Sequence, residues 1–196
     1  MKVFNITGPV LRSQQFSREP KIYKLLNENP ELLEKNSQFR LLKINKRSEK
    51  GPDFIAINKK GHLIVGEIKA GTLPSVAVKQ LKGYAIRFSE MRKDELDREI
   101  SGHKFPSLRK AYKGFLPKKA QTALLNPSRR RLQLVLVAER FSDKALKEAD
   151  LQKLPNKLRK VIKDIKCLQL QLFRNNGAKV IAVGEVISGN NRRLSK

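Results

Sequence analysis

Two acidic residues and a lysine stand at a spacing that could support metal-assisted hydrolysis. Asp53 comes directly before an apolar run, and Glu67 and Lys69 follow a second apolar run with only Ile68 between them. Oxygen ligands with room for water suit Mg²⁺ or Mn²⁺. A lysine beside such a metal can orient or deprotonate a water, or stabilise the charge that develops on a phosphate. These side chains could therefore hydrolyse a phosphodiester if the fold brings them together.

A β-hairpin is the element that would bring them together. Two short apolar runs, Phe54–Ile57 and Leu63–Val65, flank a turn-like segment that ends at Gly61. This is the pattern of two largely buried strands joined by a tight turn. If the last three residues of the segment form the loop, with Gly61 at positive φ, the register places Asp53 opposite Glu67.

The side chains of Glu67 and Lys69 point to the same face of the second strand, because they are two residues apart. Ile68 points to the other face, and its main-chain carbonyl could add a ligand beside the two carboxylates. The alternative is a surface ion-pair cluster, since Asp, Glu and Lys are common at strand ends. The spacing alone leaves both interpretations open.

The balance of charge favours a polyanion as partner. The chain of 196 residues holds 43 lysines and arginines against 18 acidic residues, a formal net charge of +25. Nucleic acid fits such a field, whereas a membrane does not, because no apolar run approaches the roughly 20 residues of a span. The N-terminal residues lack the apolar core of a signal peptide. The single cysteine, Cys167, lies in an apolar alternation typical of a reduced core thiol. We therefore expect a cytoplasmic protein.

The remaining elements predict an α/β fold with a mixed central β-sheet flanked by helices. Each is predicted from its apolar periodicity and its capping or turn residues. The predicted helices begin at Glu19-Pro20, run from Ser75 to about Arg92, and run over Lys144–Lys163 with a break or bend at Pro155. The predicted strands, besides the hairpin, cover 39–44, Leu132–Ala138, Cys167–Phe173 and Lys179–Val186, and the second hairpin strand is expected to end at Gly71.

One domain accounts for most of the chain. We expect residues 1–18 to form an N-terminal arm, residues 19–187 to form the domain, and residues 188–196 to form a basic tail. Within the domain, residues 93–131 are rich in cations and poor in periodicity. We expect them to form a basic, irregular insertion with a short helix near Ala120–Leu125.

The hairpin resembles the signature of the PD-(D/E)xK nuclease superfamily. Pro52-Asp53 is followed, after 13 intervening residues, by Glu67-Ile68-Lys69. The segment Gln80-Leu81-Lys82-Gly83-Tyr84 is similar to the QxxxY motif that follows this signature in the RecB-like branch. The helix that carries Glu19, with the segment Glu28–Leu32 after it, resembles the N-terminal part of the NucS/EndoMS-type nuclease domain. Val135–Ala149 resembles the strand and helix that close that domain, so the resemblance implies a restriction-endonuclease-like core.

The resemblance also implies roles for the residues of the hairpin and of the helix after it. Asp53 and Glu67 would be metal ligands, with the Ile68 carbonyl, and Lys69 would be the catalytic lysine. From the helix, Gln80 would approach the attacking water or the phosphate. Tyr84, four residues further on the same helical face, would help to hold that helix and the DNA.

An acid from the first helix would complete the site. The resemblance assigns this role to Glu19, directly or through water. Three further acids compete with it, and they are Glu28, Glu31 and Glu34. A first-turn acid favoured by the helix dipole is the alternative explanation for Glu19.

Two features depart from the NucS pattern. NucS-type enzymes carry a separate N-terminal domain for dimerisation and DNA binding, whereas 18 residues precede Glu19 here. The basic segment 93–131 is an insertion relative to that pattern. We therefore carry over the nuclease chemistry and leave mismatch specificity aside.

Several basic segments are expected to contact DNA phosphates, although they could also be solvated faces. Such contacts position a duplex and make binding salt-dependent without conveying sequence. The segments are Lys46–Lys50, Arg109–Lys119, Arg129–Arg131 and Arg192-Arg193, and the residues expected to bind DNA are Tyr84, Lys46, Arg47, Lys50, Arg129, Arg130 and Arg131.

The sequence as a whole predicts a Mg²⁺-dependent endonuclease that cuts duplex or branched DNA, in a repair-like or restriction-like role. A homodimer would supply the two sites that cutting both strands needs. One alternative is a non-catalytic basic DNA-binding protein on a nuclease-like scaffold. Another is a sequence-specific restriction, homing or transposition endonuclease.

Overall fold

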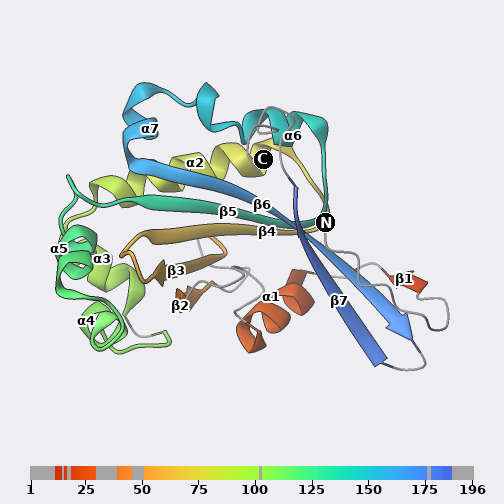
Figure 1. The fold of residues 1–196 in the computed structure, drawn as a ribbon, viewed down its shortest axis with the longest axis horizontal. Helices are drawn as coiled ribbons and strands as arrows, with labels where there is room; N and C mark the ends of the chain where they lie inside the picture. Colours follow the sequence, from red (N-terminus) through yellow and green to blue (C-terminus); the bar gives the residue numbers. More distant parts are fainter. Residues whose placement is uncertain are drawn as a thin grey trace, which may run out of the picture.

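A mixed seven-stranded β-sheet runs through the described part of the chain (Figure 1). The structure is a computed structural model, and it describes residues 12–14, 16, 19–29, 39–45, 51–101, 103–175 and 178–186. None of the described helices is long and apolar enough to cross a membrane.

The sheet combines an antiparallel half with a parallel half. The strands β2, β3 and β4 are antiparallel to one another, and β5 and β6 continue the sheet parallel to β4. The short strand β1 and the hairpin strand β7 pair with β6 in the antiparallel sense. The bounds are Arg12–Gln14 for β1, Phe39–Ile44 for β2, Phe54–Asn58 for β3, Leu63–Leu73 for β4, Leu132–Phe141 for β5, Ile162–Asn175 for β6 and Ala178–Glu185 for β7.

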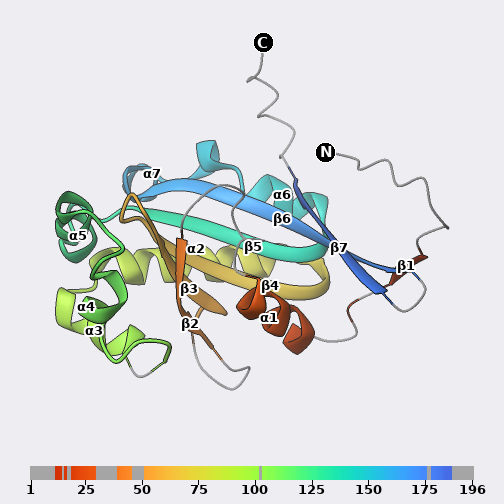
Figure 2. The ribbon, with the colours of Figure 1, turned by 60° about the horizontal axis from the view of Figure 1, so that its bottom comes forward.

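Helices cover both faces of this sheet. In Figure 1, α2, α6 and α7 lie above the sheet and α1 lies below it, while α3, α4 and α5 gather at one end. Figure 2 brings α1 forward, away from α2. The bounds are Glu19–Glu28 for α1, Ser75–Glu90 for α2, Lys93–Ile100 for α3, Leu108–Tyr112 for α4, Lys118–Leu125 for α5, Asp143–Glu148 for α6 and Asn156–Val161 for α7. The predicted α/β class is confirmed.

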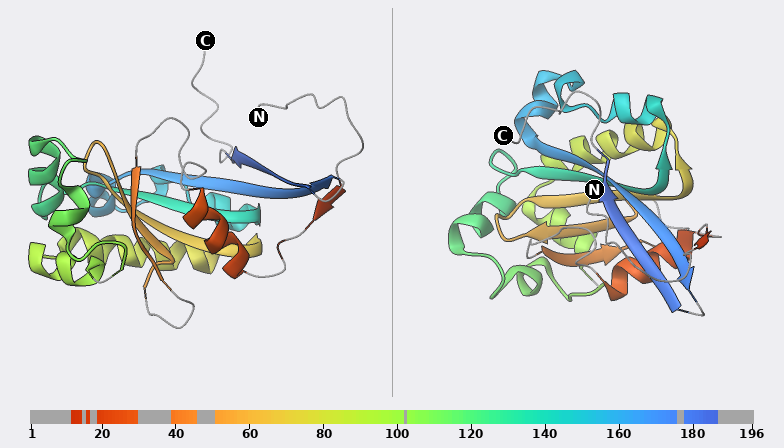
Figure 3. Two further views of the ribbon diagram at one scale, coloured as in Figure 1. Left: turned by 90° about the horizontal axis from the view of Figure 1, so that it is seen from below. Right: turned by 45° about the vertical axis from the view of Figure 1, so that its right-hand side comes forward.

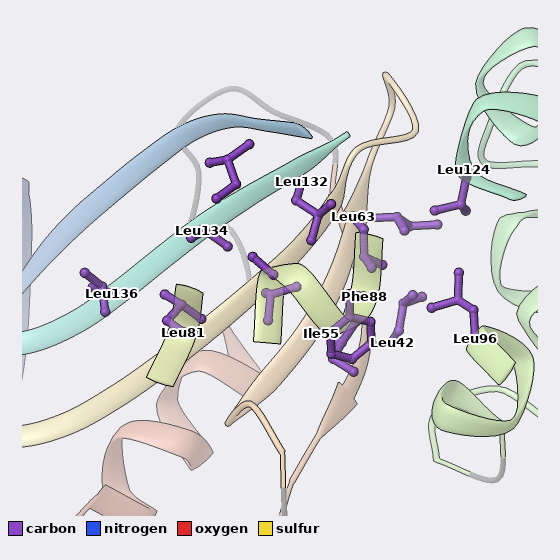
Figure 4. Packing of buried hydrophobic residues seen from close by; sticks show 14 of the residues in the cluster. Leu42, Ile55, Leu63, Leu81, Phe88, Leu96, Leu124, Leu132, Leu134 and Leu136 are labelled. Carbon is purple, nitrogen blue, oxygen red and sulfur yellow. The ribbon is translucent and has the colours of Figure 1, made fainter. Parts of the chain in front are cut away.

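Two apolar clusters fill the space on either side of the sheet. Ile55 on β3 belongs to the cluster under α2, and its neighbour Phe54 belongs to the cluster under α1, as the two-residue period of a strand requires. Figure 4 shows the first cluster, in which Leu81 and Phe88 of α2 face side chains of the sheet such as Leu134. Burial on both faces explains the near-continuous apolar runs of β3, β4 and β5.

The β3–β4 hairpin has the predicted register. Gly61 takes a φ of 77°, and Phe54 pairs with Gly66. The same register, continued by one residue, sets Asp53 opposite Glu67. Loop closure and strand pairing are local, so the turn residues and the apolar alternation were enough to predict them.

Gly66 permits the close approach of the Phe54 ring. A Cβ atom at this position would lie 1.9 Å from the nearest ring carbon of Phe54. We expect Gly66→Ala to lower the free energy of unfolding by about 3 kcal/mol, because the buried ring has no space into which to move. Urea unfolding measures the change. Gly83→Ala is the control, since nothing lies within 4 Å of its Cβ, and this helix substitution should stabilise by up to about 1 kcal/mol.

The basic insertion is more regular than predicted. The expectation of an irregular segment over residues 93–131 is wrong, because α3, α4 and α5 all lie within it; the short helix near Ala120–Leu125 is confirmed as part of α5. In α3, Leu96 and Ile100 are four residues apart and both are buried. In α4, the side chain of Ser107 caps the helix by accepting from the Lys110 N–H at 3.2 Å. Helices this short depend on such packing and caps.

Two element boundaries also differ from prediction. The helical segment predicted over Lys144–Lys163, with a break or bend at Pro155, consists of α6, a 3₁₀ turn over Leu151–Lys153 and, after Pro155, α7, and β6 already begins at Ile162. The second hairpin strand does not end at Gly71 but continues through a bulge to Leu73. In that bulge Gly71 takes a φ of 76°, and its N–H donates to Glu139 Oε2 at 2.6 Å. A carboxylate from the next strand thus supplies the bond that the bulge removes.

Candidate active site

The charged residues of the hairpin meet at the N-terminal end of β3, where β4 continues beyond its pairing with β3. Asp53 lies just before the first residue of β3, so beyond this point no described strand pairs with this edge of β4, which we call its free edge. There the Ile68 N–H donates to Asp53 Oδ2 at 2.6 Å. The N–H and C=O of one strand residue point to the same edge, so the Ile68 carbonyl is directed toward the same region. The side chain of Ile68 is buried on the opposite face, as predicted.

Three carboxylates surround the ammonium group of Lys69. Its Nζ lies 3.0 Å from Glu67 Oε1, 3.6 Å from Glu19 Oε1 and 3.9 Å from Asp53 Oδ2. The side chains are partly buried, from 7% exposed for Glu67 to 28% for Lys69. When all four groups are ionised, three negative charges face one positive charge, so the cluster has an excess of two negative charges.

Helix α1 delivers two side chains to this cluster. Glu19 is the first residue of α1, and Ile22 and Leu26 bury the helix against the sheet. Tyr23 lies one turn after Glu19, and its hydroxyl donates a hydrogen bond to the Asp53 carboxylate. Tyr23 was not among the residues predicted from the sequence. The signal that could have found it is the spacing of four residues from Glu19, which puts both side chains on one helical face.

Of the two candidate acids that the structure describes, Glu19 is the one beside Lys69. Glu28 lies at the other end of α1, where it is exposed and pairs with Lys24 at 3.8 Å. Glu31 and Glu34 lie outside the described residues.

Burial and mutual repulsion shift the proton affinities of the cluster. Burial, followed by the charge of Asp53, raises the pKa of Glu67 to about 7. Burial also raises the pKa of Asp53, although the hydrogen bonds from Tyr23 and Ile68 oppose the shift. Burial lowers the pKa of Lys69, but its hydrogen bond to Glu67 and the surrounding carboxylates together hold that pKa above its ordinary value. The raised pKa values of both carboxyls show that the single positive charge of Lys69 does not balance the acidic groups around it.

Helix α2 faces the same cluster with Tyr84. Burial, and then the negative charges of Glu67 and Asp53, raise the pKa of its hydroxyl. Gln80 lies one turn earlier on α2 and is exposed. No hydrogen bond joins Gln80 to the cluster in the described part of the chain, so the geometry brings Tyr84 toward the site and leaves Gln80 at its margin.

The donor set fits an open divalent site better than a closed one. Among the described residues, no three acidic, histidine or cysteine side chains are grouped so that they could hold a metal ion. Asp53, Glu67 and the Ile68 carbonyl remain as ligand candidates. Mg²⁺ usually takes one or two carboxylates and completes its shell with water and substrate phosphates. The two excess negative charges of the cluster match such an ion.

The predicted DNA-binding arginines divide into exposed and buried residues. Arg129 is exposed and Arg131 is half-buried, so both remain candidates for phosphate contact. The prediction for Arg130 is wrong, because its side chain is fully buried. Its guanidinium donates to main-chain carbonyls at the ends of two helices, namely Leu124, Phe88 and Met91, at 2.8, 2.6 and 2.8 Å. Lys46, Arg47 and Lys50 lie outside the described residues.

Comparison with known proteins gives distant structural matches alone. No family model and no curated protein matches the chain. Among solved structures, it is similar to an EndoMS–dsDNA complex (20% identity, 85% of this chain and 50% of that chain, TM-score 0.42). It is similar also to a repair endonuclease from Pyrococcus abyssi (19% identity, 81% of this chain and 50% of that chain, TM-score 0.42) and to EndoMS in apo form (21%, 81% and 48%, TM-score 0.42). The chain spans about half the length of these proteins. Structural similarity at this level does not support an assignment of activity. The activity is therefore inferred from the residues of the site.

Proposed function

We propose that this protein is a Mg²⁺-dependent DNA endonuclease of the PD-(D/E)xK type, acting on duplex or branched DNA, with Mn²⁺ as a substitute ion. One observation carries the proposal: Asp53, Glu67 and Glu19 converge on Lys69 at the free edge of β4. A negative cluster of this kind would repel DNA by itself. On a chain of net charge +25, the cluster could bind the substrate phosphate if a divalent cation bound there together with it.

Each residue of the cluster has a role in such a reaction. A divalent cation held by Asp53, Glu67 and the Ile68 carbonyl would polarise the phosphate and ease the deprotonation of water. Lys69 is protonated at neutral pH because its pKa is raised, so it can stabilise the negative charge that develops on the phosphate. Glu19 can accept from Lys69 and hold its ammonium group in place.

The supporting residues keep Asp53 in position. The Tyr23 hydroxyl and the Ile68 N–H both donate to its carboxylate, which fixes the orientation of a ligand before any cation arrives. Tyr84 on α2 lies near Glu67 and Asp53, so it could contact DNA bound at the cluster, and Gln80, one turn earlier, could reach the phosphate once DNA is bound. The alternatives share the scaffold: a non-catalytic basic DNA-binding protein, or an endonuclease that reads a sequence for restriction, homing or transposition.

Cleavage of plasmid and branched DNA tests the proposed activity. In Mg²⁺ or Mn²⁺, the wild type should nick or cut DNA, and Asp53→Asn should reduce the rate by at least about 10²-fold, the usual cost of removing one group that stabilises the reacting charge. If the wild type cuts nothing across substrates and ions while both proteins bind DNA equally, the non-catalytic alternative is correct. Cleavage at one sequence would identify a restriction-like enzyme, whereas cleavage at junctions or mismatches would favour repair.

Metal binding should be visible without any DNA. We expect Mg²⁺ or Mn²⁺ to stabilise the wild type by about 1.4 kcal/mol at ten times its Kd, because the ion binds the folded state alone. Thermal unfolding with and without the ion measures this gain. Asp53→Asn should lose it, whereas Glu28→Gln, which removes an exposed acid at the other end of α1, should keep it. A gain of equal size in Asp53→Asn would contradict metal binding at this site.

A further inference from the structure

The helical segment 104–131 carries a cationic surface that is separate from the acidic cluster around Lys69. Residues 104–131 contain nine lysines and arginines and no acidic residue. Arg130 is buried and structural, and Arg131 is half-buried, but the other seven are exposed. These seven are Lys104, Arg109, Lys110, Lys113, Lys118, Lys119 and Arg129. In Figure 3, the helices that carry most of them lie together at one end of the molecule.

The turn of the β3–β4 hairpin packs against this insertion and adds two more lysines. The Nζ of Lys59 lies 4.5 Å from the centre of the Phe115 ring. Gly61 approaches Ala120 so closely that a Cβ there would lie 2.5 Å from the Ala120 carbonyl oxygen. Lys59 and Lys60 therefore lie beside the beginning of α5.

Five lysines gather around this contact, and we call them the basic corner. Two come from the hairpin turn, two from the first turn of α5, and one from the end of α4. They are Lys59, Lys60, Lys113, Lys118 and Lys119, and all five are exposed.

Nothing in the described part of the chain neutralises the basic corner. None of its lysines takes part in an ion pair there. Lys118 and Lys119 are the first residues of α5, where the helix dipole disfavours positive charge. The first turn of α5 contains no acidic residue that could offset them. On the other side, Arg40 also stacks on Phe115, at 4.5 Å. So many uncompensated like charges destabilise the isolated protein, and a polyanion would relieve that repulsion.

The surroundings of the basic corner favour a duplex over a single strand. Proteins that bind single strands stack the bases on exposed aromatic rings. Here Tyr112 and Phe115 are buried, and Phe105 is packed against the core. Exposed lysines without exposed rings suit the sugar–phosphate backbone, which they can contact in any sequence.

We propose that the basic corner binds the backbone of duplex DNA about six base pairs from the cluster around Lys69. Asp53 and Lys59 stand at opposite ends of β3, six residues apart, and an extended strand rises about 3.3 Å per residue, or roughly 20 Å in all. One strand of DNA advances 3.4 Å per base pair, so about six base pairs cover this distance. The choice of DNA over RNA rests on the proposed function; backbone binding by the corner does not.

The test compares two triple variants with the same change in charge. One is Lys113→Gln, Lys118→Gln, Lys119→Gln in the basic corner. The control is Lys144→Gln, Lys147→Gln, Lys153→Gln, three exposed lysines on α6 and the turn after it, at the other end of the sheet from α5 (Figure 1). Binding of a labelled 30-base-pair duplex is measured by anisotropy across a range of salt, with no divalent ion, so that no cleavage occurs.

We expect the corner variant to bind at least about tenfold more weakly at 0.1 M salt. The slope of log Kd against log salt should fall by about 2 to 3, close to one per lost phosphate contact. The control should change Kd less than threefold. The unfolding temperature of the corner variant should match or exceed that of the wild type, since removing like charges relieves repulsion.

Three outcomes would overturn the proposal. Equal weakening in both variants would mean that net charge alone matters, and an unchanged Kd in the corner variant would mean that the corner does not touch the duplex. Tighter binding of duplex RNA of the same sequence would overturn the choice of DNA. Asp53→Asn separates this proposal from the proposed function, because it should bind the duplex at least as tightly as the wild type while failing to cut it. Loss of binding in the corner variant would still support the basic corner if the wild type proved inactive.

Discussion

Glu67→Gln is expected to abolish DNA cleavage and, at the same time, to make the folded protein more stable at neutral pH. Glutamine keeps the shape of the side chain and removes one of the three negative charges around Lys69. In the proposed reaction the Glu67 carboxylate holds the cation, so its loss should lower the cleavage rate by about 10² to 10³-fold or more. A purely structural ion-pair cluster would give the opposite effect on stability, since its carboxylates would favour folding.

The gain in stability follows from the pKa of Glu67. Its value is about 7 in the folded protein against an ordinary 4.5, so the folded state holds this proton more tightly than the unfolded chain does. The contribution of Glu67 to stability is therefore complete below about pH 4.5 and is lost as the pH rises through 7. The loss amounts to roughly 3 kcal/mol. The glutamine side chain does not titrate, so the advantage of the variant should appear between pH 5 and pH 8.

Urea unfolding at pH 5 and pH 8, in the presence of a chelator, measures this advantage. Glu148→Gln is the control of opposite sign, because the hydrogen bond from Lys82 lowers the pKa of Glu148. That variant should lose stability at both pH values, because both lie above the ordinary pKa of 4.5, where a carboxyl with a lowered folded-state pKa stabilises the fold. If Glu67→Gln loses cleavage and is also less stable at pH 8, then Glu67 belongs to a structural cluster.

Arg130→Leu is expected to destabilise the fold by about 3 to 5 kcal/mol, which is large for one substitution. The guanidinium is buried, and no carboxylate of the described residues pairs with it. Instead it donates to carbonyls at the C-terminal ends of α2 and α5, where the helix dipole is negative and the last carbonyls lack partners. Burial lowers its pKa to about 10, so the group remains charged at neutral pH. Leucine would leave the three carbonyls buried and unpaired, each at a cost of about 1 to 3 kcal/mol.

Arg129→Leu is the matched control for this prediction. Arg129 is the exposed neighbour of Arg130, and its replacement should change stability by no more than about 0.5 kcal/mol. Denaturant unfolding compares the two variants, and duplex binding is measured below the unfolding temperature of both. Arg130→Leu should then bind duplex DNA like the wild type. If it binds weakly while remaining folded and stable, Arg130 contacts DNA and the structural role is wrong.

Local sequence patterns were sufficient to predict the hairpin and to predict which of its charged residues lie close together. The apolar alternation, the position of Gly61 and the two-residue spacing of Glu67 and Lys69 act over short stretches of chain. Local rules therefore sufficed to set Asp53 opposite Glu67 and to direct Lys69 to the same face. The α/β class followed from the order of the elements in the same way.

Packing between distant elements sets which further residues lie beside that site and which cationic side chains are exposed. Glu19 rather than Glu28 reaches Lys69 because of how α1 lies on the sheet, and Tyr23 comes with it. Arg129 and Arg130 are adjacent and chemically identical in the sequence, yet one is exposed and the other is fully buried. Burial and long-range contacts depend on packing between elements that are far apart in the chain. They therefore cannot be predicted from the periodicity of a single element.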